Sequence, residues 1–227
     1  MTFQEIKDQD QSYILHTYGR VDASLVKGRN ARAWDTEGKE YIDFTSGIGV
    51  NALGYSDPAW ASAVAAQAAE IQHLCNYYYS PQNTSLAEEL CKASGMAKAF
   101  FCNSGAEANE CAVKVARKYG EKRGAYQIVT LNNSFHGRTL TTLAATGQAA
   151  FHQDFLPLTE GFVYAEGNDL SSVEALLDGT VCAVLIETVQ GEGGVVPMEE
   201  AFVQGLRKLC TEQDVLLMID EVQTGVG

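Results

Sequence analysis

The stretch Val181-Cys-Ala-Val-Leu-Ile186 contains six apolar residues in succession. A run of this length without a polar face predicts a strand that is buried on both sides. Four shorter apolar runs are expected to be its neighbours, at residues 99–102, 127–131, 162–164 and 215–219. Helical spacing lies between them, at residues 105–122, 170–177 and 199–212. This alternation predicts an α/β fold with three layers, in which helices cover both faces of a mostly parallel sheet.

The first part of the chain differs from this pattern and is typical of short strands and turns followed by a helix. Apolar and polar residues alternate around a Glu-Gly pair, which predicts a hairpin over residues 31–44. An Asp-Pro pair at residues 57–58 then begins an alanine-rich helix that extends to about residue 71. We therefore expect residues 1–70 to form the N-terminal part of a small α+β domain with its connecting helix, and residues 71–227 to belong to a large domain.

Composition excludes several classes of protein. The 227 residues carry a formal net charge of −13, which argues against a nucleic-acid partner and against a polybasic membrane contact. No uncharged apolar run is long enough for a membrane span, and Glu5, Asp8 and Asp10 make a signal or transit peptide unexpected. The six cysteines include no CxxC pair, so we expect them to be reduced, and no metal site is predicted. These features favour a cytoplasmic protein.

Ligands of parallel sheets bind at the carboxyl ends of the strands, so the polar residues that follow each apolar run form the candidate site. After the first run, Ser104 and Glu107 have the spacing of a capping box at the start of a helix. Gly105 and Ala106 are small, so an anion could approach their backbone N–H groups closely. The alternative is a well-capped helix whose small residues serve packing alone.

Phe135 and Arg138 follow the second run. The ring could lie over a flat heterocycle while the arginine holds a carboxylate. In isolation this segment is more typical of a surface loop, and His136 is more often structural than catalytic in such a setting. The long central run is followed by two carboxylates, Glu187 and Glu192, which could be functional or could belong to a solvated turn.

Asp220 ends the last run directly, so burial there would demand a cationic or hydrogen-bonding partner. The alternative is that Asp220 caps the following turn. Taken together, the four strand ends supply an anion-binding helix start, an aromatic ring with an arginine, a glycine-rich acidic loop and a buried aspartate. Pyridoxal 5′-phosphate would use all four, because it has a phosphate, a flat ring and a ring nitrogen that needs an acidic partner. The sequence therefore predicts a site for this cofactor.

At these residues the sequence resembles the class III, fold-type-I aminotransferases, and among them most closely the acetylornithine aminotransferases. Thr188 is a departure, since the family usually has proline there. The resemblance covers nearly the whole chain and implies that residues 71–227 are an incomplete large domain. It rests on the order and spacing of six motifs: Asp35-x-Glu37-Gly38-x-x-Tyr41-Ile-Asp43-Phe, Gly49-Val-Asn51-x-Leu-Gly54-x-x-x-Pro58, Phe101-Cys-Asn-Ser-Gly-Ala-Glu-Ala-Asn-Glu110, Phe135-His-Gly-Arg-Thr139, Gln190-Gly-Glu-Gly-Gly194 and Asp220-Glu-Val-Gln-Thr-Gly225.

The resemblance also implies roles around the cofactor. They are phosphate binding by Ser104, Gly105 and Ala106, ring stacking by Phe135 and Val222, pairing of the pyridine nitrogen with Asp220, a hydrogen bond from Gln223 to the phenolic oxygen, binding of the substrate α-carboxylate by Arg138, and pairing of Glu192 with a gating arginine farther along the family sequence. In the family the Schiff-base lysine lies beyond the motif that begins at Asp220. None of the nine lysines does so here, so we expect that lysine to be absent from this chain.

The implied reaction of the full-length enzyme is transfer of the amino group of N-acetylornithine to 2-oxoglutarate, in arginine biosynthesis or ornithine metabolism. Ornithine, succinylornithine and 4-aminobutyrate are alternative donors, and the family implies a homodimer. A different alternative is an inactive fragment, or a cofactor-binding part that a second chain completes. A nucleotide-binding protein is disfavoured because no GxGxxG motif opens the first helix of the predicted sheet.

Overall fold

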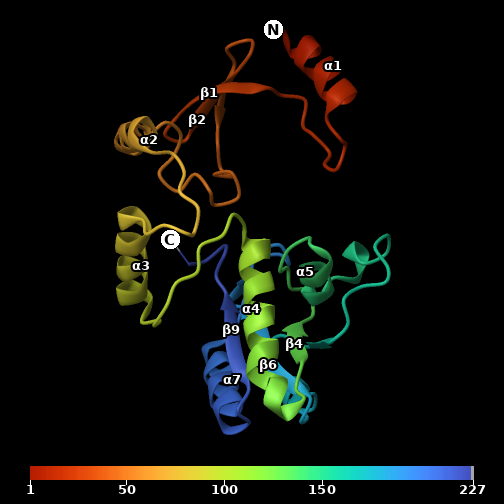
Figure 1. Ribbon diagram of the computed structural model, residues 1–227. Helices are drawn as coiled ribbons and strands as arrows, with labels where there is room; N and C mark the ends of the chain where they lie inside the picture. Colours follow the sequence, from red (N-terminus) through yellow and green to blue (C-terminus); the bar gives the residue numbers. More distant parts are fainter. Residues whose placement is uncertain (226–227) are drawn as a thin grey trace. The chain divides into compact units, whose positions relative to one another are not determined.

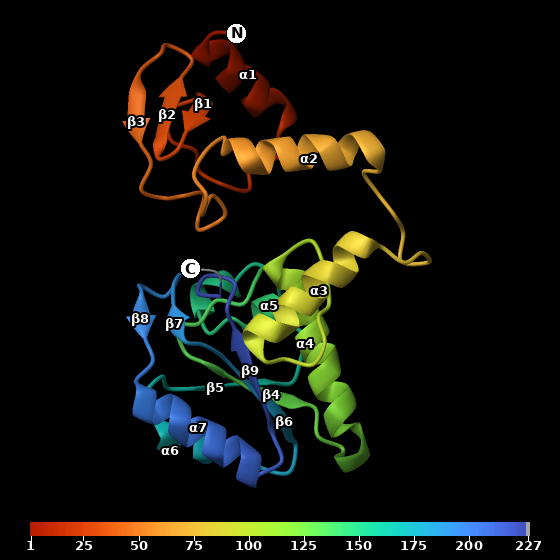
Figure 2. The same cartoon turned by 90° about the vertical axis from the view of Figure 1, so that its left-hand side faces the viewer.

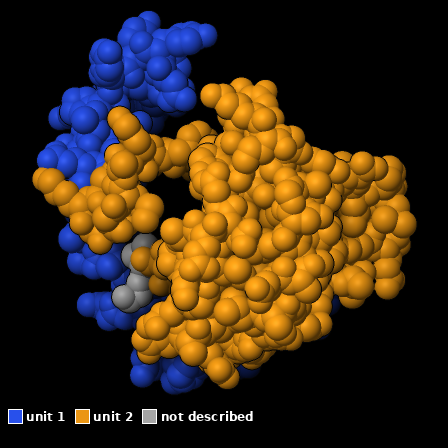
Figure 3. Space-filling model, turned by 90° about the horizontal axis from the view of Figure 1, so that it is seen from below, with its two compact units in different colours: residues 1–89 blue, residues 90–227 orange. Residues whose placement is uncertain are grey.

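A computed structural model describes residues 1–225 of the chain. It contains two compact units, Met1–Glu89 and a second unit that begins at Leu90, which Figure 3 colours separately. The boundary falls inside helix α3 (Pro81–Ser94). The sequence predicts a domain boundary after residue 70, which differs from this boundary between compact units. The predicted domain division stays a prediction.

The first unit contains a three-stranded antiparallel sheet in the order β1-β2-β3. Its elements are α1 (Phe3–Tyr13), β1 (Leu25–Arg29), β2 (Arg32–Asp35), β3 (Glu40–Ile42) and α2 (Pro58–Glu70). The predicted hairpin is confirmed, because Trp34 pairs with Glu40 across the turn. Gly38 has a φ of +82° in that turn, a conformation that glycine adopts without a steric penalty.

The two helices of this unit begin at clear capping signals. The predicted helix over residues 57–71 is confirmed as α2, where the Asp57 side chain accepts a hydrogen bond from the backbone N–H of Trp60. The expectation of only strands and turns before it was wrong, because Thr2 and Glu5 form a capping box that starts α1. A helix is usually recognised in a sequence by an apolar stripe that becomes buried. α1 has no buried residue, so this signal was missing.

The second unit is built on a four-stranded sheet in the order β5-β4-β6-β9, in which all three neighbouring pairs are parallel. The strands are β4 (Gln127–Leu131), β5 (Phe162–Ala165), β6 (Val181–Glu187) and β9 (Leu216–Asp220). Every residue of β6 is buried, as the apolar run predicts. The parallel sheet of the predicted fold is therefore confirmed.

Helices cover both faces of this sheet, as Figures 1 and 2 show. The helices are α4 (Gly105–Gly120), α5 (Leu140–Ala145), α6 (Leu170–Glu174) and α7 (Glu200–Glu212), with the short 3-10 turns η1 (Glu121–Arg123) and η2 (Ala149–Phe151). One core cluster joins the sheet to α6 and α7, for example through Leu206 and Ile186. The other joins it to α4 and α5, for example through Ala116 and Leu185. The three-layer arrangement is confirmed.

Two details of the predicted sheet were wrong. Residues 99–102 form no strand, and the Phe100 side chain is 64% exposed. An apolar run indicates burial but does not supply a pairing partner, and within residues 1–225 the sheet has its edge at β9. The helix expected over residues 170–177 already ends at Glu174. In the part of the chain that the structure describes, no helix is long and apolar enough to cross a membrane.

Candidate functional site

The start of α4 is one wall of the candidate site. The Ser104 side chain caps the helix by accepting a hydrogen bond from the N–H of Glu107 at 3.2 Å. The reciprocal half of the expected capping box is absent from this helix start, because the Glu107 carboxylate accepts from the N–H of Asn103 at 2.6 Å. The first N–H groups of a helix have no partner within the helix, so Gly105 and Ala106 present theirs at this end. A helix start of this kind attracts an anion.

Gly105 also lies close to Val222, which follows β9. A Cβ atom at position 105 would lie 2.7 Å from Cγ2 of Val222, which is closer than real carbon atoms approach. Only glycine therefore fits here without a shift. Val222 itself is 60% exposed. The structure thus brings together two of the predicted site residues that are more than a hundred positions apart in the sequence.

Asp220 is buried at the carboxyl end of β9. Its Oδ2 atom accepts a hydrogen bond from Nδ2 of Asn109 at 2.8 Å and lies 2.9 Å from Nδ1 of His136. Its Oδ1 atom accepts from the N–H of Val222 at 3.1 Å. Burial raises the pKa of the Asp220 carboxyl, but the hydrogen bonds from His136, Asn109 and the N–H of Val222, together with the electrostatic attraction of His136, outweigh it, so the pKa lies below its ordinary value. The expected need of Asp220 for hydrogen-bonding partners is confirmed.

Phe135 lies in the loop after β4 and is held through its backbone. Its N–H donates to Oε2 of Glu187 at 2.9 Å. Its ring meets Phe151 edge to face, with 6.1 Å between the ring centroids. The exposed guanidinium of Arg138 lies 5.9 Å from the Phe135 ring and 5.3 Å from the Phe151 ring. The aromatic ring and the arginine that the sequence singles out are therefore neighbours.

The acidic loop after β6 lies against the same edge. It runs between the short strands β7 (Val189–Gln190) and β8 (Val196–Pro197). The Asn133 side chain donates to the carbonyl of Gly193 at 2.6 Å, which ties this loop to the one after β4. A Cβ atom at Gly191 would lie 3.6 Å from the Gln223 side chain. Glu192 is exposed.

Sequence reasoning missed one residue of this edge, Asn109, and undervalued two others, His136 and Glu187. Asn109, on the second turn of α4, bridges the carbonyl of His136 and the carboxylate of Asp220. His136 is only 2% exposed and contacts Asp220 directly. Glu187 is 5% exposed, and burial raises the pKa of its carboxyl even though it accepts the N–H of Phe135. A polar residue inside an otherwise apolar helix face, as Asn109 is, was the available signal.

Two of the nine lysines, Lys118 and Lys208, lie on helices that cover the sheet, and neither is near the strand ends. Lys118 is in the last turn of α4, whereas the candidate site lies at its start. Lys208 lies on α7, which leads into the beginning of β9, and its side chain is 77% exposed and 3.8 Å from Glu212. Neither is therefore placed beside Asp220, which ends β9.

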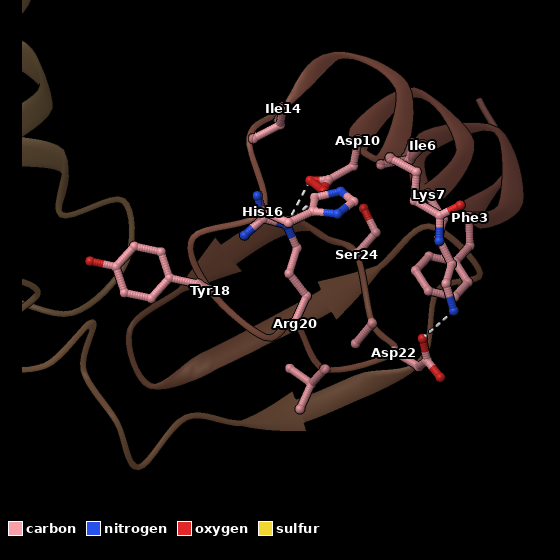
Figure 4. A pocket seen from close by; sticks show the side chains of 13 residues that line it. Phe3, Ile6, Lys7, Asp10, Ile14, His16, Tyr18, Arg20, Asp22 and Ser24 are labelled. Atoms are coloured by element: carbon pink, nitrogen blue, oxygen red, sulfur yellow. Dashed lines mark hydrogen bonds and ion pairs between the residues drawn. The ribbon is translucent and has the colours of Figure 1, made fainter. Parts of the chain in front are cut away.

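The first unit contains a separate cavity of about 580 Å³. Figure 4 shows its lining, where Lys7 pairs with Asp22 and Arg20 pairs with Asp10, each at 2.6 Å. These four charges neutralise one another in pairs. Because these charges are already paired with one another, the strand ends of the second unit are the better candidate for a functional site.

Comparison with known proteins agrees with this geometry. The chain is 49% identical over 233 residues to an acetylornithine aminotransferase of Haemophilus ducreyi, covering 100% of this chain and 59% of that protein. It is 52% identical over 230 residues to a succinylornithine transaminase of Salmonella typhimurium, covering 100% of this chain and 56% of that protein. The chain thus spans a little over half the length of these curated relatives.

A solved ornithine aminotransferase of Toxoplasma gondii has a similar fold. Its TM-score is 0.93 at 30% sequence identity, and the match covers 100% of this chain and 55% of that one. The aminotransferase class-III family model matches residues 13–227. This match covers almost the whole sequence and includes all the strand ends described above. The chain belongs to the class-III aminotransferases.

Proposed function

We propose that the second unit binds pyridoxal 5′-phosphate, and that the whole protein transfers the amino group of N-acetylornithine to 2-oxoglutarate. The family depends on this cofactor. The observation that carries the proposal is the position of Asp220, a buried carboxylate at the carboxyl end of a parallel strand, held by three hydrogen bonds. A protonated pyridine nitrogen is the cofactor group that needs such a partner.

The residues of the edge fit the other parts of the cofactor. The N–H groups of Gly105 and Ala106 at the start of α4 suit a phosphate, with Ser104 beside them. A side chain at position 105 would occupy the space beside Val222, so the glycine keeps this side of the edge open. Phe135 and Val222 are apolar side chains suited to the two faces of a flat ring, and we assign Gln223 to its phenolic oxygen.

Bound pyridoxal phosphate would supply a cationic ring that withdraws electrons from the carbon bearing the transferred amino group. Asp220 would hold the proton at the pyridine nitrogen, since the low pKa of this carboxyl keeps it anionic. Arg138 would bind the substrate carboxylate with its planar guanidinium. Glu192 would pair with a substrate-gating arginine that lies farther along the family sequence, as the family resemblance implies.

N-acetylornithine is the proposed donor because acetylornithine aminotransferases are among the close relatives, at 49% identity. Succinylornithine is the second candidate, since a succinylornithine transaminase is 52% identical. The two donors differ only in the acyl group on the α-nitrogen, and the side-chain amino group is the one transferred. Ornithine and 4-aminobutyrate remain further candidates. We also propose a cytoplasmic homodimer, on the basis of the family.

The test is amino transfer by the purified protein, with its intact mass measured in the same preparation. Each donor is supplied with 2-oxoglutarate, and the glutamate formed is quantified. The proposal expects the highest rate with N-acetylornithine. Equal or faster transfer from 4-aminobutyrate would contradict the proposed donor. If a preparation whose only mass is that of this chain binds the cofactor but transfers no amino group from any donor, cofactor binding is supported and amino transfer by this chain is refuted.

A further inference from the structure

His136 and Asn109 converge on one oxygen atom of Asp220. Nδ1 of His136 and Nδ2 of Asn109 lie 2.9 Å and 2.8 Å from Oδ2, and all three side chains are at least nine-tenths buried. Asn109 also donates to the backbone carbonyl of His136 at 2.9 Å, so the two donors are tied to each other. The backbone of His136 is fixed in turn, because its N–H donates to Oγ1 of Thr146 at 3.0 Å.

This arrangement determines which part of the carboxylate is left for a ligand. An ionised carboxylate has about four acceptor positions. Two of them, on Oδ2, are taken by His136 and Asn109, and one on Oδ1 is taken by the N–H of Val222. The fourth acceptor position is on Oδ1, the oxygen nearer to the Val222 segment. Because three donors fix the plane of the carboxylate, this acceptor position points in a defined direction.

We propose that His136 and Asn109 are positioning residues, which hold Asp220 ionised and oriented so that its Oδ1 accepts the proton-bearing nitrogen of the cofactor ring. This assignment rests on the proposed cofactor site. His136 is suited to the task because Nδ1 must be the protonated ring nitrogen to donate to an anionic carboxylate. Its Nε2 is buried and has no hydrogen-bond partner among the described residues. A tautomer with no proton on Nε2 therefore avoids burying an N–H group that lacks an acceptor.

A packing role alone makes a different prediction from a positioning role. If His136 only filled space, an aromatic residue of similar size would replace it. If it orients Asp220, a replacement must donate from the Nδ1 position. His136→Phe keeps a ring and removes the donor, whereas His136→Asn removes the ring but places an amide nitrogen near the Nδ1 position. Comparison of these two variants therefore distinguishes a packing role of His136 from a positioning role.

The first measurement is the titration of Asp220 in the cofactor-free chain, by NMR of aspartate labelled with ¹³C at Cγ and with Asp220→Asn to assign the signal. The titratable groups that face Asp220 are His136 and, on the adjacent strand, Glu187. We expect His136→Phe to move the Asp220 midpoint to higher pH, because a donor to the ionised form is lost while burial remains. His136→Asn is expected to return it toward the wild-type midpoint.

The second measurement is the affinity for pyridoxamine 5′-phosphate, which has the ring and phosphate but no aldehyde to react with lysines. We expect His136→Phe to weaken binding by about tenfold or more, and His136→Asn to recover most of the loss. His152→Phe is the matched control, because the His152 ring bonds the backbone carbonyls of Leu143 and Thr146, lies beside the Tyr164 ring and forms no hydrogen bond with Asp220 in the described part of the chain. It should leave the Asp220 midpoint unchanged.

Unchanged Asp220 titration and unchanged affinity in His136→Phe would overturn the positioning role. If that variant does not fold, as judged by circular dichroism, Asn109→Leu tests the same claim from the other donor and should also raise the midpoint. A wild-type chain that binds no pyridoxamine 5′-phosphate would refute the proposed cofactor site. In that case the NMR titration still decides whether His136 controls the carboxylate.

Discussion

Glu187 and Asp220 occupy paired positions on the neighbouring parallel strands β6 and β9, at the ends where both strands finish. Both side chains are at most 9% exposed, yet their pKa values are displaced in opposite directions. Burial dominates at Glu187 and raises the pKa of its carboxyl. At Asp220 burial is outweighed by the interactions with His136 and Asn109 and the hydrogen bond from the N–H of Val222, taken together. Two adjacent carboxyl groups with separated pKa values can play different roles at one pH.

The anionic form of Asp220 should stabilise the folded chain. Its pKa is lower in the folded protein than its ordinary value, so this stability is present above the ordinary aspartate pKa and is lost as the pH falls through the folded one. Asp220→Asn should therefore lower the free energy of unfolding at neutral pH by about 1–3 kcal/mol, the scale for hydrogen bonds to a charged group. Urea unfolding at several pH values should show the difference shrinking in acid. A difference that is independent of pH would contradict this explanation.

Glu187 should have the opposite pH dependence. Its pKa is raised in the folded protein, so its contribution to stability is present below the ordinary glutamate pKa and is lost as the pH rises through the folded one. Glu187→Gln keeps an oxygen to accept the N–H of Phe135 and removes the charge. We expect it to raise stability above that pH by roughly 1 kcal/mol, measured by thermal unfolding across the range. A variant that is less stable than the wild type at high pH would show that the charge is needed.

Gly105→Ala should disturb the contact between α4 and the segment after β9. The added Cβ would lie 2.7 Å from Cγ2 of Val222, so one of the two must move, at a cost of about 1–3 kcal/mol. The affinity for pyridoxamine 5′-phosphate should fall as well. Gly179→Ala is the matched control, because nothing lies within 4 Å of a Cβ there, and its effect should stay within about 0.5 kcal/mol. Equal effects of the two variants in thermal unfolding would refute the close approach.

Arg138→Lys tests the proposed carboxylate contact in protein that transfers amino groups. Lysine keeps the charge but cannot bind a carboxylate with two parallel hydrogen bonds. We expect KM for the amino donor to rise by about tenfold or more, while the affinity for pyridoxamine 5′-phosphate stays unchanged. Steady-state kinetics and a binding titration separate these effects. Loss of cofactor affinity without a change in KM would assign Arg138 to the cofactor instead.

The sheet could be predicted from the sequence because its strands are mostly apolar runs. β6 is buried at every position, and β9 ends at Asp220 where the run ends. The segment 99–102 has the same character but forms no strand, since pairing depends on a neighbour that composition does not reveal. α1 escaped prediction for the opposite reason, because it has good capping residues but no buried face.

The candidate site was predictable only as a set of strand ends. Parallel topology brings these ends to one edge, so Phe135 and Asp220 could be expected near each other. The contacts of Asn109 and His136 with Asp220 span 111 and 84 residues, and no local spacing rule reports contacts of that range. The sequence likewise did not reveal that half of the Ser104 capping box is missing, because the spacing does not show that the Glu107 carboxylate accepts the N–H of Asn103.

The central claim is that Asp220 makes this strand edge a site for the cofactor ring. The most direct test is calorimetric titration of the chain with pyridoxamine 5′-phosphate, in wild-type form and as Asp220→Asn. Asparagine preserves the shape of the side chain but removes the charge that attracts a protonated ring nitrogen. The account predicts saturable binding by the wild type and an affinity lower by about tenfold or more in Asp220→Asn. Equal affinity of the two proteins, or no binding by the wild type, would contradict it.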